Sequence, residues 1–230
     1  MIDFHSHILP GMDDGSKSVE ESVEMLNALS EQGITRVVAT PHFYANDESV
    51  SEFLGRRQES LEKLSRNLSP QMPQIMLGAE VRYYEGLSRH ENIRDLCLQG
   101  TKLLLIEMPE CRWSEFAIRE LTDIACGGRI IPVLAHIERC IFLQKKEVLF
   151  RLLHNGVLMQ INAEFLSGFL SRGKAVKLLK NNQVHFIGSD CHNMQSRPPD
   201  IGKAYQTVFN KLGGDFAEAF NNFIDEFIET

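Results

Sequence analysis

The sequence lacks an apolar run long enough to cross a membrane. Its longest runs, such as 130–135, fall far short of the roughly 20 residues that a spanning helix needs. Met1 is followed almost at once by Asp3, His5 and His7, so a basic segment with an apolar stretch behind it is also missing. We therefore expect no membrane insertion and no export through a secretory signal.

Paired cysteines are missing as well. The chain has 5 cysteines among 230 residues, and their spacing shows no pairs of the kind that build a disulfide framework. An odd, scattered set is typical of buried or free thiols in a reducing compartment, so we expect a cytoplasmic protein. The five are Cys97, Cys111, Cys126, Cys140 and Cys191.

An excess of positive charge is also absent. The formal net charge is −7 at pH 7, which makes the surface acidic overall. Such a surface repels the phosphate backbone of nucleic acids, so we expect no nucleic-acid partner.

What the chain does contain is a regular alternation of short apolar runs with longer stretches of helical period. With 43% hydrophobic residues in 230, it can build a substantial core, and we expect one domain over residues 1–230. The alternation predicts a parallel α/β sheet, either a closed or nearly closed barrel or a doubly wound open sheet. The seven predicted strands begin near Ile2, Thr35, Gln74, Lys102, Arg129, Val157 and Val184.

Helix boundaries are signalled at several points. Ser18 and Glu21 form a capping box at the start of the first helix, and Gly33 is placed to end it. A long helix is predicted over 47–68 from its apolar stripe. Further helices are predicted over 114–126, 145–154 and 172–182, and in two pieces from about 200 to the end, divided at Gly213-Gly214.

Potential metal ligands follow most of the predicted strands. Carboxyl ends of parallel strands share one face of a barrel, so residues distant in sequence converge there. Singly, each has a simpler explanation, because a lone histidine beside an apolar run is more often a hydrogen-bonded structural residue. The joint pattern favours a metal site, since nearly every predicted strand ends in an imidazole or a carboxylate. These residues are His5, His7, His42, Glu80, Glu107, His136, Asp190 and His192.

Carboxylates and neutral imidazoles gathered in one cleft need cations to balance their charge and to replace lost solvation. Mixed nitrogen and oxygen ligands without a cysteine thiolate suit Mn²⁺, Fe²⁺ or Zn²⁺, and the number of ligands allows more than one ion. The residues themselves thus indicate a metal centre.

Several of these residues lie in longer motifs. They are Asp3-Phe4-His5-Ser6-His7-Ile8-Leu9-Pro10-Gly11 with Asp13-Asp14-Gly15, Ala39-Thr40-Pro41-His42, Gly78-Ala79-Glu80, Ala135-His136 with Glu138-Arg139, and Ser189-Asp190-Cys191-His192-Asn193 with Arg197-Pro198-Pro199. In these motifs the chain resembles the PHP (polymerase and histidinol phosphatase) superfamily. Within it, the chain is most similar to the manganese-dependent bacterial protein-tyrosine phosphatases of capsule and exopolysaccharide operons.

The resemblance implies an α/β fold, namely a distorted (β/α)7 TIM-like barrel of the PHP type, in agreement with the seven predicted strands. It also implies a trinuclear metal centre. One ion would be bound by His5, His7, Glu80 and Asp190, a second by Glu80 as a bridge with Glu107 and His136, and a third by Asp14, His42 and His192.

The activity implied by the resemblance is hydrolysis of phosphotyrosine on the tail of a bacterial tyrosine kinase that regulates capsule or exopolysaccharide synthesis. About three divalent ions are expected, with Mn²⁺ favoured and Fe²⁺, Zn²⁺ or Co²⁺ as alternatives. A water bridging two cations loses a proton easily, and the resulting hydroxide would attack phosphorus. Arg139 and Arg197 are the candidates to bind the phosphoryl oxygens, although a helix start and a solvated loop explain them equally well without the resemblance.

A different enzyme class is suggested by Cys191 and Arg197, which have the Cys-x5-Arg spacing of cysteine-dependent phosphatases. That chemistry needs backbone N–H groups wrapped around the phosphate and a thiolate stabilised at a helix start. Residues 192–196 contain no glycine, and Cys191 lies between two expected ligands. We therefore expect Cys191 not to act as the nucleophile.

Two further alternatives use the same centre. A histidinol-phosphate phosphatase would act on a small phosphomonoester, but the chain has few insertions with which to close a small pocket. A metal-loaded barrel could also bind a phosphorylated kinase tail without turnover. The full set of ligands and the two arginines favour an enzyme.

Overall fold

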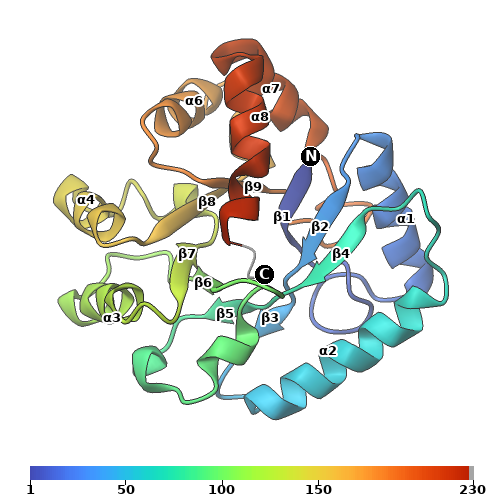
Figure 1. Ribbon diagram of the computed structural model, residues 1–230, viewed down its shortest axis with the longest axis horizontal. Coiled ribbons are helices and arrows are strands. Elements are labelled where there is room, and N and C mark those ends of the chain that lie inside the picture. Colours follow the sequence, from blue (N-terminus) through green and yellow to red (C-terminus); the bar gives the residue numbers. More distant parts are fainter. Residues whose placement is uncertain (228–230) are drawn as a thin grey trace.

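The computed structural model describes residues 1–227 and shows a curled parallel sheet with helices packed around its outside (Figure 1). Every strand pair is parallel. The strands are β1 (Ile2–Ser6), β2 (Arg36–Ala39), β3 (His42–Phe43), β4 (Gln74–Leu77), β5 (Glu80–Arg82), β6 (Leu103–Glu107), β7 (Ile131–Leu134), β8 (Leu158–Asn162) and β9 (Phe186–Gly188).

Two of the seven predicted strands are interrupted, so that each contributes to two sheets. The first sheet has the order β1-β2-β4, and the second has the order β3-β5-β6-β7-β8-β9. The chain passes from β2 to β3 at Pro41, which has no N–H for the ladder, and from β4 to β5 at Gly78. An isolated bridge between Ser6 and Cys191 brings the two outer strands β1 and β9 together.

The helices cover the outer face of the sheet. They are α1 (Val19–Glu31), α2 (Val50–Ser65), α3 (Glu115–Cys126), α4 (Lys146–His154), α5 (Ala163–Ser167), α6 (Arg172–Lys180), α7 (Gly202–Leu212) and α8 (Gly214–Asn222). Between or after them, the described residues also form the 3-10 helices η1 (Leu87–Arg89), η2 (Ile93–Leu96), η3 (Ile137–Arg139) and η4 (Phe223–Phe227).

Local signals placed most helix ends within two residues. The Ser18 side chain caps α1 by accepting from the N–H of Glu21, while the Glu21 carboxylate bonds to the N–H of Lys17 instead of the capping residue. The helix predicted over 47–68 is shorter, because Ser49 and Glu52 form a complete capping box that starts α2 at Val50.

The predicted division of the C-terminal helix at Gly213-Gly214 is confirmed, since α7 ends at Leu212 and α8 begins at Gly214. The second piece was predicted to run to the end of the chain, but α8 ends at Asn222 and the 3-10 helix η4 follows it. Residues 228–230 lie outside the described part. The short helix α5 was not predicted, because five residues carry too little periodicity to be recognised.

Inside the curled sheet, side chains change from apolar to polar toward the carboxyl end, as β6 shows. Leu103 and Leu105 of β6 belong to an inner cluster with Phe4, and Glu107 follows on the same face. The inner cluster is filled from the amino ends of the strands by Ile224 of η4. In Figure 1 the red segment that ends the described chain accordingly lies over the middle of the ring of strands. The polar side chains are thereby left at the opposite, carboxyl end.

No helix within residues 1–227 combines the length and the apolar character needed to cross a membrane.

Candidate metal centre

The nine predicted ligands lie at the carboxyl ends of the strands, most of them buried. Within the described residues, three groups offer ligand atoms close enough to share an ion. His5, His7 and Asp190 form the first group, His7, Asp14, His42 and His192 the second, and His42, Glu80 and Glu107 the third.

The first group closes around one point. The Nε2 atoms of His5 and His7 are 3.2 Å apart, and Oε2 of Glu80 lies 3.2 and 3.3 Å from them. Oδ1 of Asp190 lies 3.7 and 3.6 Å from the same two nitrogens. Neighbouring ligands of one ion, bound at about 2.1 Å, are separated by roughly 3–3.5 Å. The two imidazoles and Glu80 lie at this spacing, and Asp190 lies slightly farther from the imidazoles.

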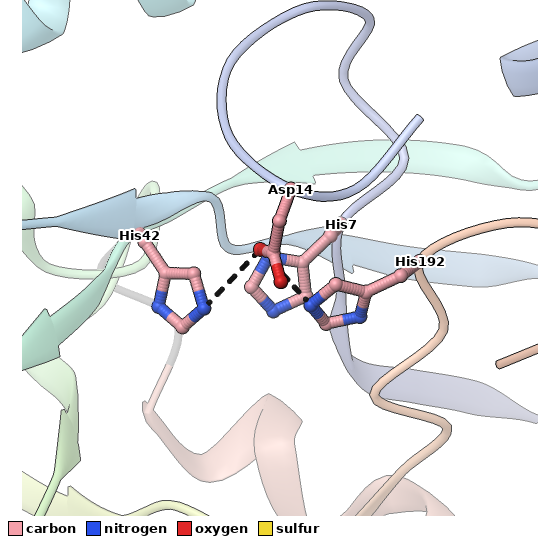
Figure 2. A group of neighbouring side chains, drawn as sticks. All are labelled: His7, Asp14, His42 and His192. Carbon is pink, nitrogen blue, oxygen red and sulfur yellow. Dashed lines mark ion pairs between the residues drawn. The ribbon is translucent and has the colours of Figure 1, made fainter. Parts of the chain in front are cut away.

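The second group is centred on Asp14, which comes from the loop after β1. Figure 2 shows His42 and His192 on either side of this carboxylate, with His7 beside them. Oδ1 of Asp14 lies 3.6 Å from Nε2 of His42 and 3.3 Å from Nε2 of His192. The group holds the third predicted ligand set and adds His7 to it.

Glu80 joins the remaining ligands. Its Oε1 lies 2.8 Å from Nε2 of His136, while its Oε2 lies 3.0 Å from Nδ1 of His42. The same His136 nitrogen is 3.8 Å from Oε1 of Glu107, whose other oxygen is paired with Arg82 at 2.7 Å. Glu80 therefore has one oxygen toward each side, as a bridging carboxylate requires.

Three buried polar atoms of the cluster have no hydrogen-bond partner among residues 1–227. They are Oε2 of Glu80, Oδ1 of Asp190 and Nδ1 of His42. A buried unpaired atom of this kind costs about 1–3 kcal/mol, and more when it is charged. Each of them lies beside other potential ligand atoms, so divalent cations fit the site by satisfying atoms that the protein leaves without partners.

Two histidines are oriented by residues that the sequence did not single out. Nδ1 of His7 donates to Oδ2 of Asp13 over 2.7 Å, and Nδ1 of His5 lies 3.4 Å from Oε1 of Gln160. Because carboxylate and amide oxygens only accept, each ring turns its Nε2 toward the cluster, as metal ligation requires. Gln160 also accepts the backbone N–H of His136 over 2.7 Å.

The backbone at the site is held in conformations that side chains rarely adopt. His136 and Asp190 have φ angles of +28° and +55°. Gly188 leaves room for His5, because a Cβ atom at that position would lie 2.5 Å from Cβ of His5. At these two ligands, tertiary contacts therefore override the backbone conformation that the residue type would prefer.

Charges within the cluster stabilise ionised carboxylates. Burial alone would raise the pKa of Glu80, but the imidazoles of His5, His136 and His7 hold it well below its usual value. Burial would likewise lower the pKa of His7, yet Asp13 and Glu80 raise it to about 10. An ion that binds Nε2 of His7 must displace this proton, so metal affinity rises with pH.

Both predicted arginines contact the same oxygen of one ligand. Nη2 of Arg139 and Nη2 of Arg197 each lie 2.7 Å from Oδ2 of Asp190, which also accepts from Asn162 over 2.8 Å. Nη1 of Arg197 lies 2.8 Å from Nε2 of His192, whose Nδ1 donates to the Asp190 carbonyl. One lone pair cannot serve both partners, so an ion on His192 requires Arg197 to turn away.

Sequence reasoning missed Asp13, Gln160 and Asn162 as supports of the ligands. Gln160 donates to Oδ1 of Asn162 over 3.0 Å, which links His136 to Asp190 through two amides. The available signal was the polar pair at alternate positions of β8, an otherwise apolar strand without a ligand at its end.

Cys191 cannot serve as a nucleophile in this fold. Its side chain is fully buried, and burial beside Asp3 raises the pKa of its thiol well above the usual value. Its backbone carbonyl accepts from the N–H of His7, so the residue is part of the junction between β1 and β9. These features agree with the expectation drawn from the sequence.

Residues 1–224 match a protein-family model described as "Capsular polysaccharide synthesis, CpsB/CapC". The chain belongs to the CpsB/CapC family. It is 33% identical to the tyrosine-protein phosphatase YwqE of Bacillus subtilis over 221 residues, covering 94% of this chain and 86% of YwqE. It is 31% identical to the tyrosine-protein phosphatase CpsB of Streptococcus agalactiae over 228 residues, covering 94% of this chain and 93% of CpsB.

The fold is similar to a solved member of the CpsB/CapC family. Crystal structures of YwqE from Bacillus subtilis and CpsB from Streptococcus pneumoniae describe unique metal-dependent tyrosine phosphatases. The fold of this chain matches a chain from those crystal structures with a TM-score of 0.80 at 28% sequence identity. The match covers 100% of this chain and 96% of the solved chain. The predicted family, the α/β fold with its curled parallel sheet, and the class of metal-dependent tyrosine phosphatase of capsule synthesis are confirmed.

Proposed function

We propose that this CpsB/CapC chain removes phosphate from phosphotyrosine on the tail of a bacterial tyrosine kinase that regulates capsule or exopolysaccharide synthesis. The reaction would take place in the cytoplasm, with residues 1–230 acting as one catalytic domain. The family description supports the pathway, and the names of the relatives support the chemistry.

We infer a centre of about three divalent ions, with Mn²⁺ favoured over Fe²⁺, Zn²⁺ and Co²⁺. The observation that carries this proposal concerns Oε2 of Glu80 and Oδ1 of Asp190, which are buried among imidazoles. Neither oxygen has a hydrogen-bond partner in the described residues. Oxygen and nitrogen ligands without thiolates suit these ions. The sets are His5, His7, Glu80 and Asp190 for one ion, Glu80, Glu107 and His136 for the next, and Asp14, His42 and His192 for the last.

Divalent ions bound there would supply Lewis acidity, which lowers the pKa of a water nucleophile and withdraws charge from phosphoryl oxygens. The part of the chain in this reaction is to hold the ions and to orient the phosphate. Arg139 and Arg197 both reach the edge of the cluster at Asp190, and guanidinium groups bind phosphate in a bidentate manner. When Arg197 leaves His192, its guanidinium becomes available to the substrate.

The site is open toward solvent, which supports a protein-borne phosphotyrosine as substrate. The side chain of Asp14 is 65% exposed, and those of Arg139 and Arg197 are 33% and 39% exposed. A tyrosyl ring extending from a flexible tail can therefore enter without a lid having to open. A small phosphomonoester such as histidinol phosphate would gain little enclosure there.

The test is phosphate release by chelator-treated protein with and without added Mn²⁺. A phosphotyrosine peptide and histidinol phosphate are supplied as competing substrates. The proposal predicts peptide hydrolysis that is lost on chelation and restored by Mn²⁺. A preference for histidinol phosphate would contradict the substrate, and activity indifferent to chelation would contradict the centre.

A further inference from the structure

The rim around the metal centre is divided by charge. Loops after β1 and β3 carry Asp14, Asp47 and Glu48. Loops after β7 and β8, with the helices that follow them, carry exposed lysines at Lys145 and Lys174 instead. In a chain of net charge −7, this basic side stands out from the rest of the surface.

The same basic side exposes four large apolar side chains, which we call the apolar rim. Phe142 and Leu143 follow η3 and are 62% and 48% exposed. Phe169 and Leu170 lie between α5 and α6 and are 90% and 88% exposed. Scattered single apolar residues are ordinary on surfaces, but two adjacent pairs on neighbouring loops indicate an interaction site.

Hydrogen bonds hold one of these loops in place, so Phe142 and Leu143 cannot simply turn inward. The next residue, Gln144, is buried, donates to the carbonyl of Cys111 over 2.7 Å and accepts from the N–H of Trp113 over 3.1 Å. Moving this loop inward, so that Phe142 and Leu143 become buried, would require these bonds to break.

The other loop is also fixed by its own bonds. The N–H of Gly168 donates to the carbonyl of Glu164 over 2.8 Å, and Nη2 of Arg172 donates to the carbonyl of Ser167 over 3.0 Å. Phe169 and Leu170 therefore lie on a constrained turn and remain exposed.

The apolar rim lies beside the metal centre and its arginines. Phe142 comes three residues after Arg139, whose guanidinium contacts Asp190. The amino group of Lys174 in α6 lies 4.7 Å from the centre of the Phe142 ring, which brings the two loops together. In a substrate protein whose phosphotyrosine lies between Arg139 and Arg197, the residues that flank the phosphotyrosine must pass over one side of this rim.

We propose that the apolar rim binds the residues flanking phosphotyrosine in the protein substrate, and that this flanking segment carries acidic and apolar side chains. The inference rests on the proposed function. Acidic residues of this segment are attracted by the exposed Lys145 and Lys174 on the basic side. Apolar residues of the same segment gain by covering the exposed rings.

The test uses the double variant F169S/L170S of the full chain loaded with Mn²⁺. Three substrates are compared, namely a phosphotyrosine peptide flanked by Glu and Leu, the same peptide flanked by Lys and Ser, and p-nitrophenyl phosphate. We expect the variant to raise KM for the Glu and Leu peptide about tenfold, because aromatic and aliphatic anchors dominate such contacts. Its kcat and its activity on p-nitrophenyl phosphate should be unchanged.

Phe209 provides the matched control. It is 59% exposed on α7, where it lines a hollow with Met1 at the amino ends of the strands, away from the metal centre. F209S removes one exposed aromatic ring far from the apolar rim and should leave KM for both peptides at the wild-type value.

The outcomes separate the two proposals. If wild type hydrolyses both peptides with equal KM, or if F169S/L170S matches wild type, the apolar rim does not bind substrate and the proposed function stands. If wild type cleaves p-nitrophenyl phosphate but neither peptide, the proposed function fails. Binding of wild type, but not F169S/L170S, to phosphatidylserine vesicles with unchanged peptide kinetics would assign the rim to a membrane and overturn the inference.

Discussion

Along β6, Leu103 and Leu105 face an apolar interior, whereas Glu107, two residues further on, faces the ligand cluster. The amino end of the barrel is filled by rings and aliphatic chains, including Phe4 stacked on Phe186 with centroids 3.9 Å apart. The carboxyl end instead gathers unpaired polar atoms and strained backbone. The same strands therefore stabilise the fold at one end and bring the candidate metal ligands together at the other.

The contrast also separates two buried glutamates. Glu120 in α3 is 4% exposed, and its oxygens accept from Tyr83, Gly86 and Ser88. Glu80 is 1% exposed, but its Oε2 has no hydrogen-bond donor within the part of the chain that the structure describes. A carboxylate whose partners are all protein groups serves structure, and one whose partners are left open serves a ligand.

The largest expected effect comes from E80Q. Removing the bridging charge should lower the rate of phosphotyrosine hydrolysis about a thousandfold or more and reduce the number of bound ions. Rate assays and elemental metal analysis on the same preparation would measure both. E120Q is the matched control, and it should lose stability while keeping the rate and the metal content. A wild-type rate in E80Q with full metal content would show that the centre is assigned wrongly.

At the amino end, L105A should act on stability instead of chemistry. Leu105 is fully buried in the inner cluster, and truncation of a buried leucine to alanine lowers the free energy of unfolding by about 2–5 kcal/mol. Urea unfolding would measure the loss. The rate per folded molecule should remain near the wild-type value, and a collapse of that rate would mean that the two ends are coupled.

The pH dependence of stability has a distinct origin at the amino end. The His185 ring lies against Phe223 with centroids 5.9 Å apart, and its Nδ1 accepts from the N–H of Met159 over 3.1 Å. Burial lowers the pKa of His185 to about 4. The unfolded chain, with a histidine pKa of about 6.5, therefore binds a proton first as the pH falls.

Stability from neutral His185 is thus fully present above about pH 6.5 and is lost progressively as the pH falls toward 4, by on the order of 2–3 kcal/mol. Urea unfolding of chelated protein at pH 7.5, 5.5 and 4.5 would measure this loss. H185Q retains an acceptor for Met159 and does not titrate, so its stability should fall less steeply over the same range. Equal slopes in the two proteins would contradict this assignment.

The smallest effect is expected from Q160L, which lies between the two ends. The variant removes the acceptor shared by Nδ1 of His5 and the N–H of His136. Loss of such support typically weakens metal binding by about 10–100-fold. Chelator competition would give the affinity. Q160E, which keeps the acceptor oxygen, should bind metal more tightly than Q160L, and no difference between them would argue against an orienting role.

Much of the fold could be predicted because its signals are local. The strand starts follow from apolar runs. The helices α1 and α3 begin directly after Ser18 and Ser114, because those side chains accept from free N–H groups of the first turn. The exact start of α2 was missed because the Ser49 capping box lies inside an apparently continuous helical pattern. Strand-end position likewise indicated the ligand candidates, since parallel strands bring their carboxyl ends to one face.

The sequence by itself determined which residue types end the strands and hence the chemistry that the barrel can support. Only the tertiary structure decided that Asp13 orients His7 while Asp14 faces His42 and His192, and that Gln160 joins His5 to His136. Strand period and helix capping depend on neighbours a few residues away. Distances between side chains of different strands depend on how the sheet curls and where it breaks, as at Pro41 and Gly78, which no local pattern records.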